Sequence, residues 1–528
     1  MENKDYVIGI DIGSSSVVMS VGEKLDDGKL KIVGLEVVPV GESTVKDGAI
    51  RNFLELGEAI GKAKSNTEGY IGRRLNSAYV GISGKDIYCV RYEDHVFVKD
   101  KDGSISNEDV KALKERIDKI PSGNNDEIVA RLPLRYRIDD RQYVKNPVGT
   151  FGRKLSATYL LVLVSKQQIE LVKRAMHRAE MSLAGLCITP TILPDILLDK
   201  SEMEDGIAIV DIGADLTDIV VMNNGRICYF VSLPIGASTI DADLREFFCV
   251  PKDKVEVIKK RCVSVIAEEV TDDLTTSVQI AGRGKKQILQ RNIAEIVEER
   301  LKDIAAIVAK TLKDAKVSTK IPCGVIITGA SAYLADIERL FARELKMEVR
   351  LANNIYGLDE ESKAQISTYA SAASVAIAYY GSQHAACITT KVPSSIGVTP
   401  TPQNKENPKE EVGVLNLTNT PSGATTPSVA TPKTESQVEE TPLVEPMTEK
   451  GASLPNPEEV VVVETEGTTP EVVIEDEVKG EGETEVAPAT ETTPTYQAPT
   501  AKKIGGFKRL LRTFNETMNN ILNGNGEI

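Results

Sequence analysis

Histidine and cysteine are scarce in this 528-residue sequence, which contains three histidines and seven cysteines. The histidines are not clustered, so a metal site built on histidine is not expected. The cysteines form no close pair and their number is odd, which favours buried thiols in a reducing compartment over a disulfide framework or a zinc site. The cysteines are Cys89, Cys187, Cys228, Cys249, Cys262, Cys323 and Cys387.

Long apolar runs are also missing, and one stretch is poor in basic residues. No run of 18 apolar residues occurs, so no membrane-spanning helix is predicted, and residues 1–5 lack the apolar core of a signal peptide. Residues 385–501 contain twenty acidic residues, six lysines and no arginine, and so carry −14 of the total charge of −15. The remainder is almost neutral, so no general affinity for nucleic acid is expected.

Two segments that lie 200 residues apart carry nearly the same motif. Residues 7–18 and 207–221 each contain an apolar run, an Asp, a Gly turn and a second apolar run. Apolar runs bounded by turn residues are typical of buried strands. We interpret the repeat as a duplicated domain whose two halves enclose one ligand.

The residue types in these two turns suit a nucleotide phosphate. Gly13 and Gly213 allow tight turns and a close approach of the ligand, and the hydroxyls and backbone N–H groups that follow donate hydrogen bonds to phosphate oxygens. Asp11 and Asp211 would repel a triphosphate unless a cation lay between them, so we expect them to hold a hydrated Mg2+. The alternative for either copy alone is an ordinary hairpin turn.

Hydrophobic patterns place further elements between the two motifs. Residues 85–165 are predicted to form a separate small α/β unit, in which Ser106 and Asp109 resemble a capping box at the start of a helix. The predicted helices are 53–65, 106–120 and 166–180, and the predicted strands are 77–82, 87–92, 127–138 and 158–164.

The composition changes after Gly381. Residues 385–501 are rich in Thr, Pro, Glu, Ser and Val and offer too little apolar surface to fold, so we predict a disordered linker. Residues 502–522 then place apolar side chains at helical spacing beside five basic residues and one acid, a pattern typical of an amphipathic helix at a membrane surface. A helix that packs back onto the body of the protein is the alternative. The residues expected at the membrane are Ile504, Phe507, Lys508, Arg509, Leu511, Arg512, Phe514, Met518 and Ile521.

Together these motifs resemble those of the actin-like ATPases, and most closely those of the FtsA family of bacterial cell-division proteins. Residues 11–15 are similar to the first phosphate motif of that superfamily and residues 211–217 to the second. Residues 328–332 resemble the adenosine motif, with Ala330 in place of the usual second Gly. Residues 282–300 are similar to a family stretch in which a glutamate-bearing helix lines the adenosine side.

The resemblance implies an α/β fold of the actin-like (ribonuclease H-like) type, with two lobes and an inserted subdomain IC in place of the usual subdomain IB. The implied division is subdomain IA at 1–84 and 166–204, IC at 85–165, IIA at 205–236 and 301–384, IIB at 237–300, a disordered acidic linker at 385–501 and an amphipathic membrane-targeting helix at 502–523.

The resemblance also implies a site and partners. ATP and Mg2+ are the implied cofactors, with Asp11 and Asp211 linked to the metal and weakly catalytic. The implied nucleotide contacts are Gly13, Ser14, Ser15, Ser16, Gly213, Ala214, Thr217, Gly236, Glu295, Glu298, Gly329, Ala330 and Ser331. The implied partners are the C-terminal peptide of FtsZ, further copies of the chain, other division proteins and the anionic inner-membrane surface. Arg283, Lys285, Lys286 and Arg300 are the expected contacts of the acidic peptide, with a solvated charge cluster as the alternative.

The expected role is a cell-division protein that polymerises on the cytoplasmic face of the membrane at the septum and tethers FtsZ filaments there. The segment where the chain is expected to cross between the two halves, residues 185–191, offers no carboxylate or amide to position a water, so at most slow ATP hydrolysis is expected. A pilus-assembly scaffold and an actin-fold enzyme, such as a kinase or chaperone ATPase, are the alternatives.

Overall fold

The computed structural model describes residues 6–391 of the chain, apart from 281, 283, 367 and 385–388. Among these residues, no helix is long and apolar enough to cross a lipid bilayer. The predicted membrane-targeting helix and most of the predicted linker lie outside the described residues. The linker was predicted to begin at residue 385, but the structure places a short strand, β20 (Thr389–Lys391), against β6 (Arg73–Leu75).

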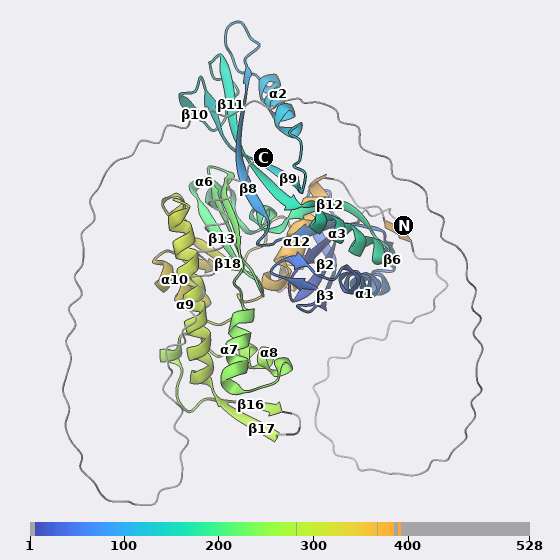
Figure 1. Ribbon diagram of the computed structural model, residues 1–528, viewed down its shortest axis with the longest axis vertical. Helices are drawn as coiled ribbons and strands as arrows, with labels where there is room; N and C mark the ends of the chain where they lie inside the picture. The colour runs from blue at the N-terminus through green and yellow to red at the C-terminus, as the bar shows by residue number, and fades with distance from the viewer. Residues whose placement is uncertain (1–5, 281, 283, 367, 385–388, 392–528) are drawn as a thin grey trace, which may run out of the picture. The chain divides into compact units, whose positions relative to one another are not determined.

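A five-stranded sheet forms the centre of the first half of the chain (Figure 1). Its order is β12-β7-β1-β2-β3, with β1 antiparallel to β2 and parallel to β7. The two strands of the first repeated motif, β1 and β2, are buried along most of their length because their runs are apolar on both faces. The strands are β1 (Tyr6–Ile12), β2 (Ser16–Lys24), β3 (Leu30–Pro39), β7 (Ser77–Ile82) and β12 (Ser182–Ile188).

Three helices pack around this sheet, namely α1 (Phe53–Ile71), α3 (Lys166–Arg178) and α12 (Thr368–His384). The small residues of α12 allow a close approach to β1, where a Cβ on Gly9 would lie 2.4 Å from the carbonyl oxygen of Ser374. Helix α1 runs six residues beyond its predicted end and stops at Gly72, which has φ 67° and donates its N–H to the carbonyl of Glu68.

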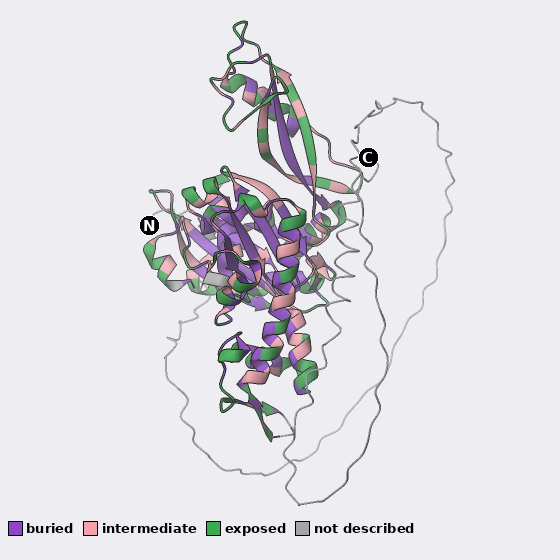
Figure 2. Ribbon diagram, turned by 90° about the vertical axis from the view of Figure 1, so that its left-hand side faces the viewer, coloured by how far each residue is buried: buried purple, intermediate pink, exposed green. Residues whose placement is uncertain are grey.

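A second sheet repeats the arrangement of the first. Its order is β15-β14-β13-β18-β19, again with an antiparallel meander on one side and parallel strands on the other. Figure 2 shows the buried residues along the central strands of the structure. The strands are β13 (Ile207–Ile212), β14 (Thr217–Asn223), β15 (Arg226–Leu233), β18 (Val325–Thr328) and β19 (Val349–Leu351).

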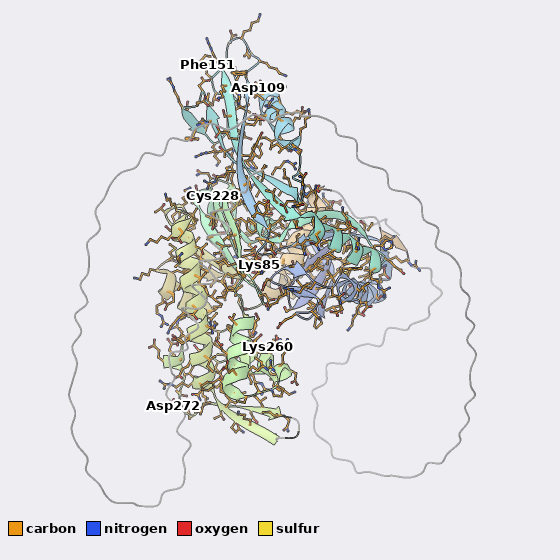
Figure 3. All side chains as sticks on the ribbon, in the orientation of Figure 1. Lys85, Asp109, Phe151, Cys228, Lys260 and Asp272 are labelled. Carbon is orange, nitrogen blue, oxygen red and sulfur yellow. The ribbon has the colours of Figure 1, made fainter. Side chains whose placement is uncertain are left out.

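The chain between β7 and α3 forms an inserted unit (residues 88–165) with its own sheet and its own apolar core. The sheet order is β10-β9-β11-β8. The predicted capping box is confirmed, because the side chains of Ser106 and Asp109 each accept the other's backbone N–H. Figure 3 labels Asp109. The elements are β8 (Tyr88–Phe97), α2 (Asn107–Asp118), β9 (Asp126–Ile138), β10 (Gln142–Val144) and β11 (Lys154–Ser165).

A mainly helical segment follows the second motif. Its longest element, α9, carries a buried apolar stripe that packs against the core of the second sheet. The elements are α7 (Ser238–Phe248), α8 (Lys252–Lys260), β16 (Thr275–Ile280), β17 (Gly284–Leu289), α9 (Gln290–Asp314) and α10 (Ile337–Leu345). The remaining short elements are β4 (Val45–Lys46), β5 (Ala49–Ile50), α4 (Thr189–Ile192), α5 (Pro194–Leu197), α6 (Lys200–Asp205) and α11 (Glu360–Gln365).

Candidate functional site

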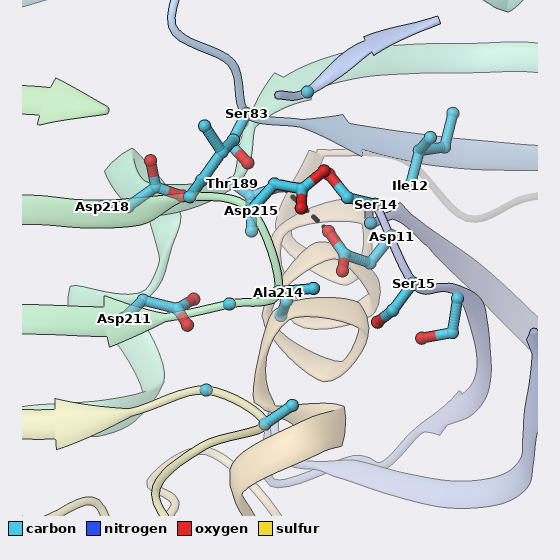
Figure 4. Close-up of a pocket in the computed structure, with 18 of the residues that line it drawn as sticks. Asp11, Ile12, Ser14, Ser15, Ser83, Thr189, Asp211, Ala214, Asp215 and Asp218 are labelled. Atoms are coloured by element: carbon cyan, nitrogen blue, oxygen red, sulfur yellow. Dashed lines mark hydrogen bonds between the residues drawn. The ribbon is translucent and has the colours of Figure 1, made fainter. Parts of the chain in front are cut away.

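The two Asp-x-Gly turns face one pocket (Figure 4). The first turn joins β1 to β2, the second joins β13 to β14, and the turn after β18 closes a third side. The pocket is lined by Asp11, Ile12, Gly13, Ser14, Ser15, Ser16, Val18, Gly48, Ser83, Thr189, Asp211, Gly213, Ala214, Asp215, Leu216, Asp218, Gly329, Ala330 and Ala373. The structure therefore brings together segments that the sequence separates by more than 300 residues.

Equivalent backbone hydrogen bonds close the two turns. The N–H of Gly13 donates to the carbonyl of Ser16 at 3.0 Å, and the N–H of Gly213 donates to the carbonyl of Leu216 at 2.8 Å. The first turn presents three serine hydroxyls, residues 14–16, to the pocket. Hydroxyl donors of this kind suit a phosphate group.

The turn after β18 presses against the second motif. Gly329 has φ 93°, and a Cβ at this position would lie 2.3 Å from Oδ1 of Asp211 and 2.6 Å from the carbonyl oxygen of Ile212. Glycine is therefore required here both by the backbone conformation and by the contact. Ala330 lines the pocket beside it, at the position where the resemblance implies a second Gly.

Burial raises the pKa of three carboxyl groups at the pocket. Burial raises the pKa of Asp11 from 3.8 to about 7, although a hydrogen bond from Thr189 opposes the rise. Burial and the nearby Asp218 and Asp11 carboxylates raise the pKa of Asp211 well above its usual range. Asp218 pairs with Asp211 across the β13–β14 ladder, and burial raises its pKa to about 6. These groups lack the positive charge that would favour their ionised forms.

The pocket wall fits a site for a cation held through water. Oδ1 of Asp218 is buried without a hydrogen-bond partner, and the residues that line the pocket include no lysine or arginine. Within the described residues, no group of three His, Cys, Asp or Glu side chains is arranged to hold a metal directly. Mg2+ keeps several of its waters and uses few protein carboxylates, so the observed wall suits this ion bound through its hydration shell.

Comparison with known proteins agrees with this architecture. A family model described as "Cell division protein FtsA" matches residues 208–374, and a second, "SHS2 domain inserted in FTSA", matches residues 84–163. The FtsA protein of Bacillus subtilis is 28% identical over 357 residues, which cover 67% of this chain and 80% of that protein. The FtsA protein of Escherichia coli K12 is 24% identical over 391 residues, covering 72% and 91%.

Over these regions the chain is similar to the FtsA family. The family is named for cell division, and the fold is actin-like. The solved structure of a "PilM-PilN type IV pilus biogenesis complex" is similar with a TM-score of 0.51 at 13% identity, covering 71% of this chain and 98% of that one. At that identity the likeness concerns the fold alone. The region that matches the SHS2 model, residues 84–163, covers all but the last two residues of the inserted unit.

Several residues implied by the resemblance to FtsA do not line the pocket. Gly236 and Thr217 lie behind the second turn, where a Cβ on Gly236 would lie 2.5 Å from the carbonyl oxygen of Ala214 and Thr217 donates to a backbone carbonyl. Ser331 is buried and its N–H donates to the carbonyl of Ile212. These three residues support the turns and do not contact the pocket space.

The expected glutamate contacts are placed elsewhere by the structure. The Glu298 carboxylate is buried, accepts the N–H of Ala267 at 2.9 Å and pairs with Arg343 at 2.7 Å. Glu295 is exposed and pairs with Arg291. Neither residue lines the pocket, and their contact with a nucleotide stays a prediction.

The expected peptide contacts also differ from one another. Arg300 is buried and bound by Asp243 and Asp303, so it is not available to a peptide. Lys285 is exposed, and Lys286 donates to the carbonyl of Phe248. Arg283 and the nine predicted membrane residues between 504 and 521 lie outside the described residues.

Nine residues of the wall were not among the predicted site residues, and the polar ones are Ser83, Thr189, Asp215 and Asp218. A signal for Asp218 was available, because a hairpin that closes at Gly213 places residue 218 opposite residue 211. The equivalent position in the first hairpin is Val18, so the charge is not part of the repeat. Thr189 lies in the segment expected to cross between the halves, where its Oγ1 donates to Oδ1 of Asp11 at 3.2 Å.

Proposed function

We propose that this protein binds ATP with Mg2+ between its two Asp-x-Gly turns. The observation that carries the proposal is the pair of matching turns at one pocket, with Asp11 and Asp211 at the ends of equivalent strands and no basic side chain among the lining residues. Such a wall favours an anionic ligand only when a cation accompanies it. The serine turn would contact phosphate oxygens, and Gly329 and Ala330 would lie beside the rest of the nucleotide.

The metal would be held through water by Asp11 and Asp211, with Asp218 as a buried neighbour. When bound, it would supply positive charge beside the phosphates. Thr189 fixes the orientation of the Asp11 carboxylate through its hydrogen bond. Residues 185–191, at the crossing between the two halves, offer no carboxylate or amide to position a water, so hydrolysis is proposed to be slow.

We further propose that the chain polymerises on the cytoplasmic face of the cell membrane and attaches FtsZ filaments to it at the division septum. Similarity to the FtsA family supports a role in division. The basic amphipathic pattern of residues 502–522 supports reversible attachment to an anionic membrane, and an array of copies would bind more tightly through avidity. The FtsZ tail peptide is proposed to bind near the exposed Lys285.

The subdomain division follows as part of this proposal. The division would keep subdomain IA at 1–84 and 166–204, IC at 85–165, IIA at 205–236 and 301–367, and IIB at 237–300. Helix α12 was expected in IIA, but it packs against β1 and β2 and would therefore join IA. The inserted unit has a core of its own, which suits a surface that contacts other division proteins.

Liposome flotation tests the membrane part of the proposal. The full chain and a chain that ends at residue 501 are mixed with anionic vesicles, with ATP and Mg2+, in the presence and absence of FtsZ. We expect the full chain to float and to carry FtsZ with it, and the shortened chain to remain at the bottom. Equal flotation of both chains would contradict the tether, and flotation without recruitment of FtsZ would contradict the adaptor role.

A further inference from the structure

The pocket has an imbalance of charge that a single hydrated cation only partly offsets. Four aspartate side chains line it, those of Asp11, Asp211, Asp215 and Asp218, while the lining residues include no lysine or arginine. A triphosphate adds further negative charge. A basic side chain that reaches the phosphates from just outside the wall would therefore strengthen binding.

Lys46 is placed to do this. It belongs to the hairpin β4–β5, whose two-residue turn, Asp47 and Gly48, has φ values of 51° and 77°. Positive φ at both turn positions is the geometry of a tight hairpin. Gly48 itself lines the pocket, and a Cβ on it would lie 2.2 Å from the carbonyl oxygen of Ser83. The hairpin is thus fixed against the end of β7, with Lys46 next to the pocket.

The Lys46 ammonium is bound to Asp215 of the second phosphate turn, with Nζ 3.2 Å from Oδ1. Asp215 also accepts the N–H of Asp47 at 3.3 Å and the hydroxyl of Ser238 at 2.8 Å. The Asp215 side chain is only 5% exposed, whereas the Lys46 side chain is 31% exposed. The buried partner would therefore keep two hydrogen-bond donors if Lys46 moved, so its departure leaves no unpaired buried carboxylate.

We propose that Lys46 is a phosphate-binding residue of this site, held by Asp215 in the nucleotide-free protein and transferred to the terminal phosphate when a nucleoside triphosphate binds. The proposal deepens the proposed ATP site and rests on it. Asp215 acts as a positioning residue that keeps the ammonium beside the pocket and competes with phosphate for it. Lys46 would then favour triphosphate over diphosphate, because the diphosphate lacks the group that displaces Asp215.

The simpler reading of the same contact is a brace between the two halves of the chain. Both readings predict that loss of Lys46 matters, but they differ for Asp215. If the ion pair is a brace, removing either partner has the same effect. If Asp215 competes with phosphate, removing the Asp215 charge releases Lys46 and has the opposite effect.

The test is a double-mutant cycle on the full chain, with Lys46→Gln, Asp215→Asn and the double variant. Binding of ATP with Mg2+ and of ADP with Mg2+ is measured by calorimetry. We expect Lys46→Gln to weaken ATP binding about 10- to 100-fold, the range for a hydrogen bond to a charged group, and ADP binding far less. Asp215→Asn is expected to tighten ATP binding, and this gain is expected to disappear in the Lys46→Gln background.

Two controls separate folding and local effects from phosphate binding. Lys85→Gln removes a neighbouring ion pair, in which Nζ of Lys85 (Figure 3) lies 3.2 Å from Oδ2 of Asp47 in the turn of the hairpin. This variant is expected to leave the preference for ATP unchanged. Lys46→Arg keeps the positive charge and is expected to restore most of the ATP affinity. Retained ADP binding by Lys46→Gln shows that this variant still folds.

Three results would overturn the proposal. The first is that Lys46→Gln and Asp215→Asn both weaken the binding of ATP and ADP equally. The second is that Asp215→Asn still tightens ATP binding when Lys46 is replaced. The third is that Lys85→Gln lowers the preference for ATP as much as Lys46→Gln does. In each case wild-type ATP binding would leave the proposed function in place. A wild-type chain that binds no ATP would overturn the proposed function as well.

Discussion

Replacing Asp11 by Asn is expected to stabilise the nucleotide-free protein while removing its response to ATP. The carboxyl pKa of Asp11 is raised from 3.8 to about 7 by burial, so its ionised form is unfavourable in the folded protein near neutral pH. Asn has nearly the same shape, and its amide oxygen can still accept the hydrogen bond from Thr189. The variant therefore removes the charge and keeps the packing.

The size of the effect follows from the difference between the two pKa values. A rise of three pKa units means that the Asp11 carboxyl destabilises the folded protein by about 4 kcal/mol above pH 7. This is an upper value because water can approach the pocket. Between these two pKa values the folded protein retains a proton that the unfolded chain releases. The stability of the folded protein is therefore highest, as far as Asp11 is concerned, below about pH 4, and it falls as the pH rises to about 7. For a chain of this size a gain of 4 kcal/mol corresponds to a rise of several degrees in Tm.

Thermal unfolding between pH 4 and 8, with and without ATP and Mg2+, measures both halves of the prediction. At pH 7.5 the Asp11→Asn variant should have a higher Tm than the wild type without nucleotide and should gain little from ATP with Mg2+. Its stability should also fall less steeply with rising pH. A lower Tm without nucleotide, or a wild-type response to ATP, would refute the reasoning.

A control of opposite sign is available in the inserted unit. The Asp109 carboxylate accepts hydrogen bonds from Ser106, and these bonds lower its pKa against the effect of burial. Asp109→Asn removes a charge that the fold favours, so it should lower Tm at pH 7.5 and leave the response to ATP intact.

Two further predictions concern the turn after β18 and the inserted unit. Gly329→Ala should lower Tm and abolish stabilisation by ATP in the same thermal assay, because its Cβ would lie 2.3 Å from Oδ1 of Asp211, and wild-type behaviour would contradict this contact. Arg226→Gln should speed amide hydrogen exchange in β9 and β10 without changing ATP affinity. The reason is that Arg226 donates to the carbonyls of Leu134 and Lys145 and lies 5.0 Å from the ring centroid of Tyr136. Unchanged exchange would show that these contacts do not hold the inserted unit.

The repeated motifs were sufficient to predict the pocket and its main parts. An apolar strand, an Asp and a Gly turn are local features, and their pairing in two equivalent sheets follows from the repeat. Asp11, Asp211, both glycines of the turns and the three serines line one pocket, and their contacts with a nucleotide and a metal stay predictions. The inserted unit was also predictable in outline, because its helix and strands have clear periodicity and its helix begins with a capping box.

The sequence could not place the side chains whose surroundings depend on distant packing. Glu298 and Arg300 are charged residues on a long helix, and sequence alone gives no reason to expect them to be buried by Arg343 and Asp243. Lys46 and Asp215 are separated by 169 positions, so their contact was not foreseen either. Charge marks these residues as polar, but only the fold shows whether the charge faces a ligand or another part of the chain.

A structure of the full chain with ATP and Mg2+ would test the central claim most directly. The account predicts that the phosphates lie between residues 13–16 and 213–216, with the metal on the side of Asp11 and Asp211. A nucleotide bound elsewhere, or a pocket that stays empty at saturating ATP and Mg2+, would contradict it.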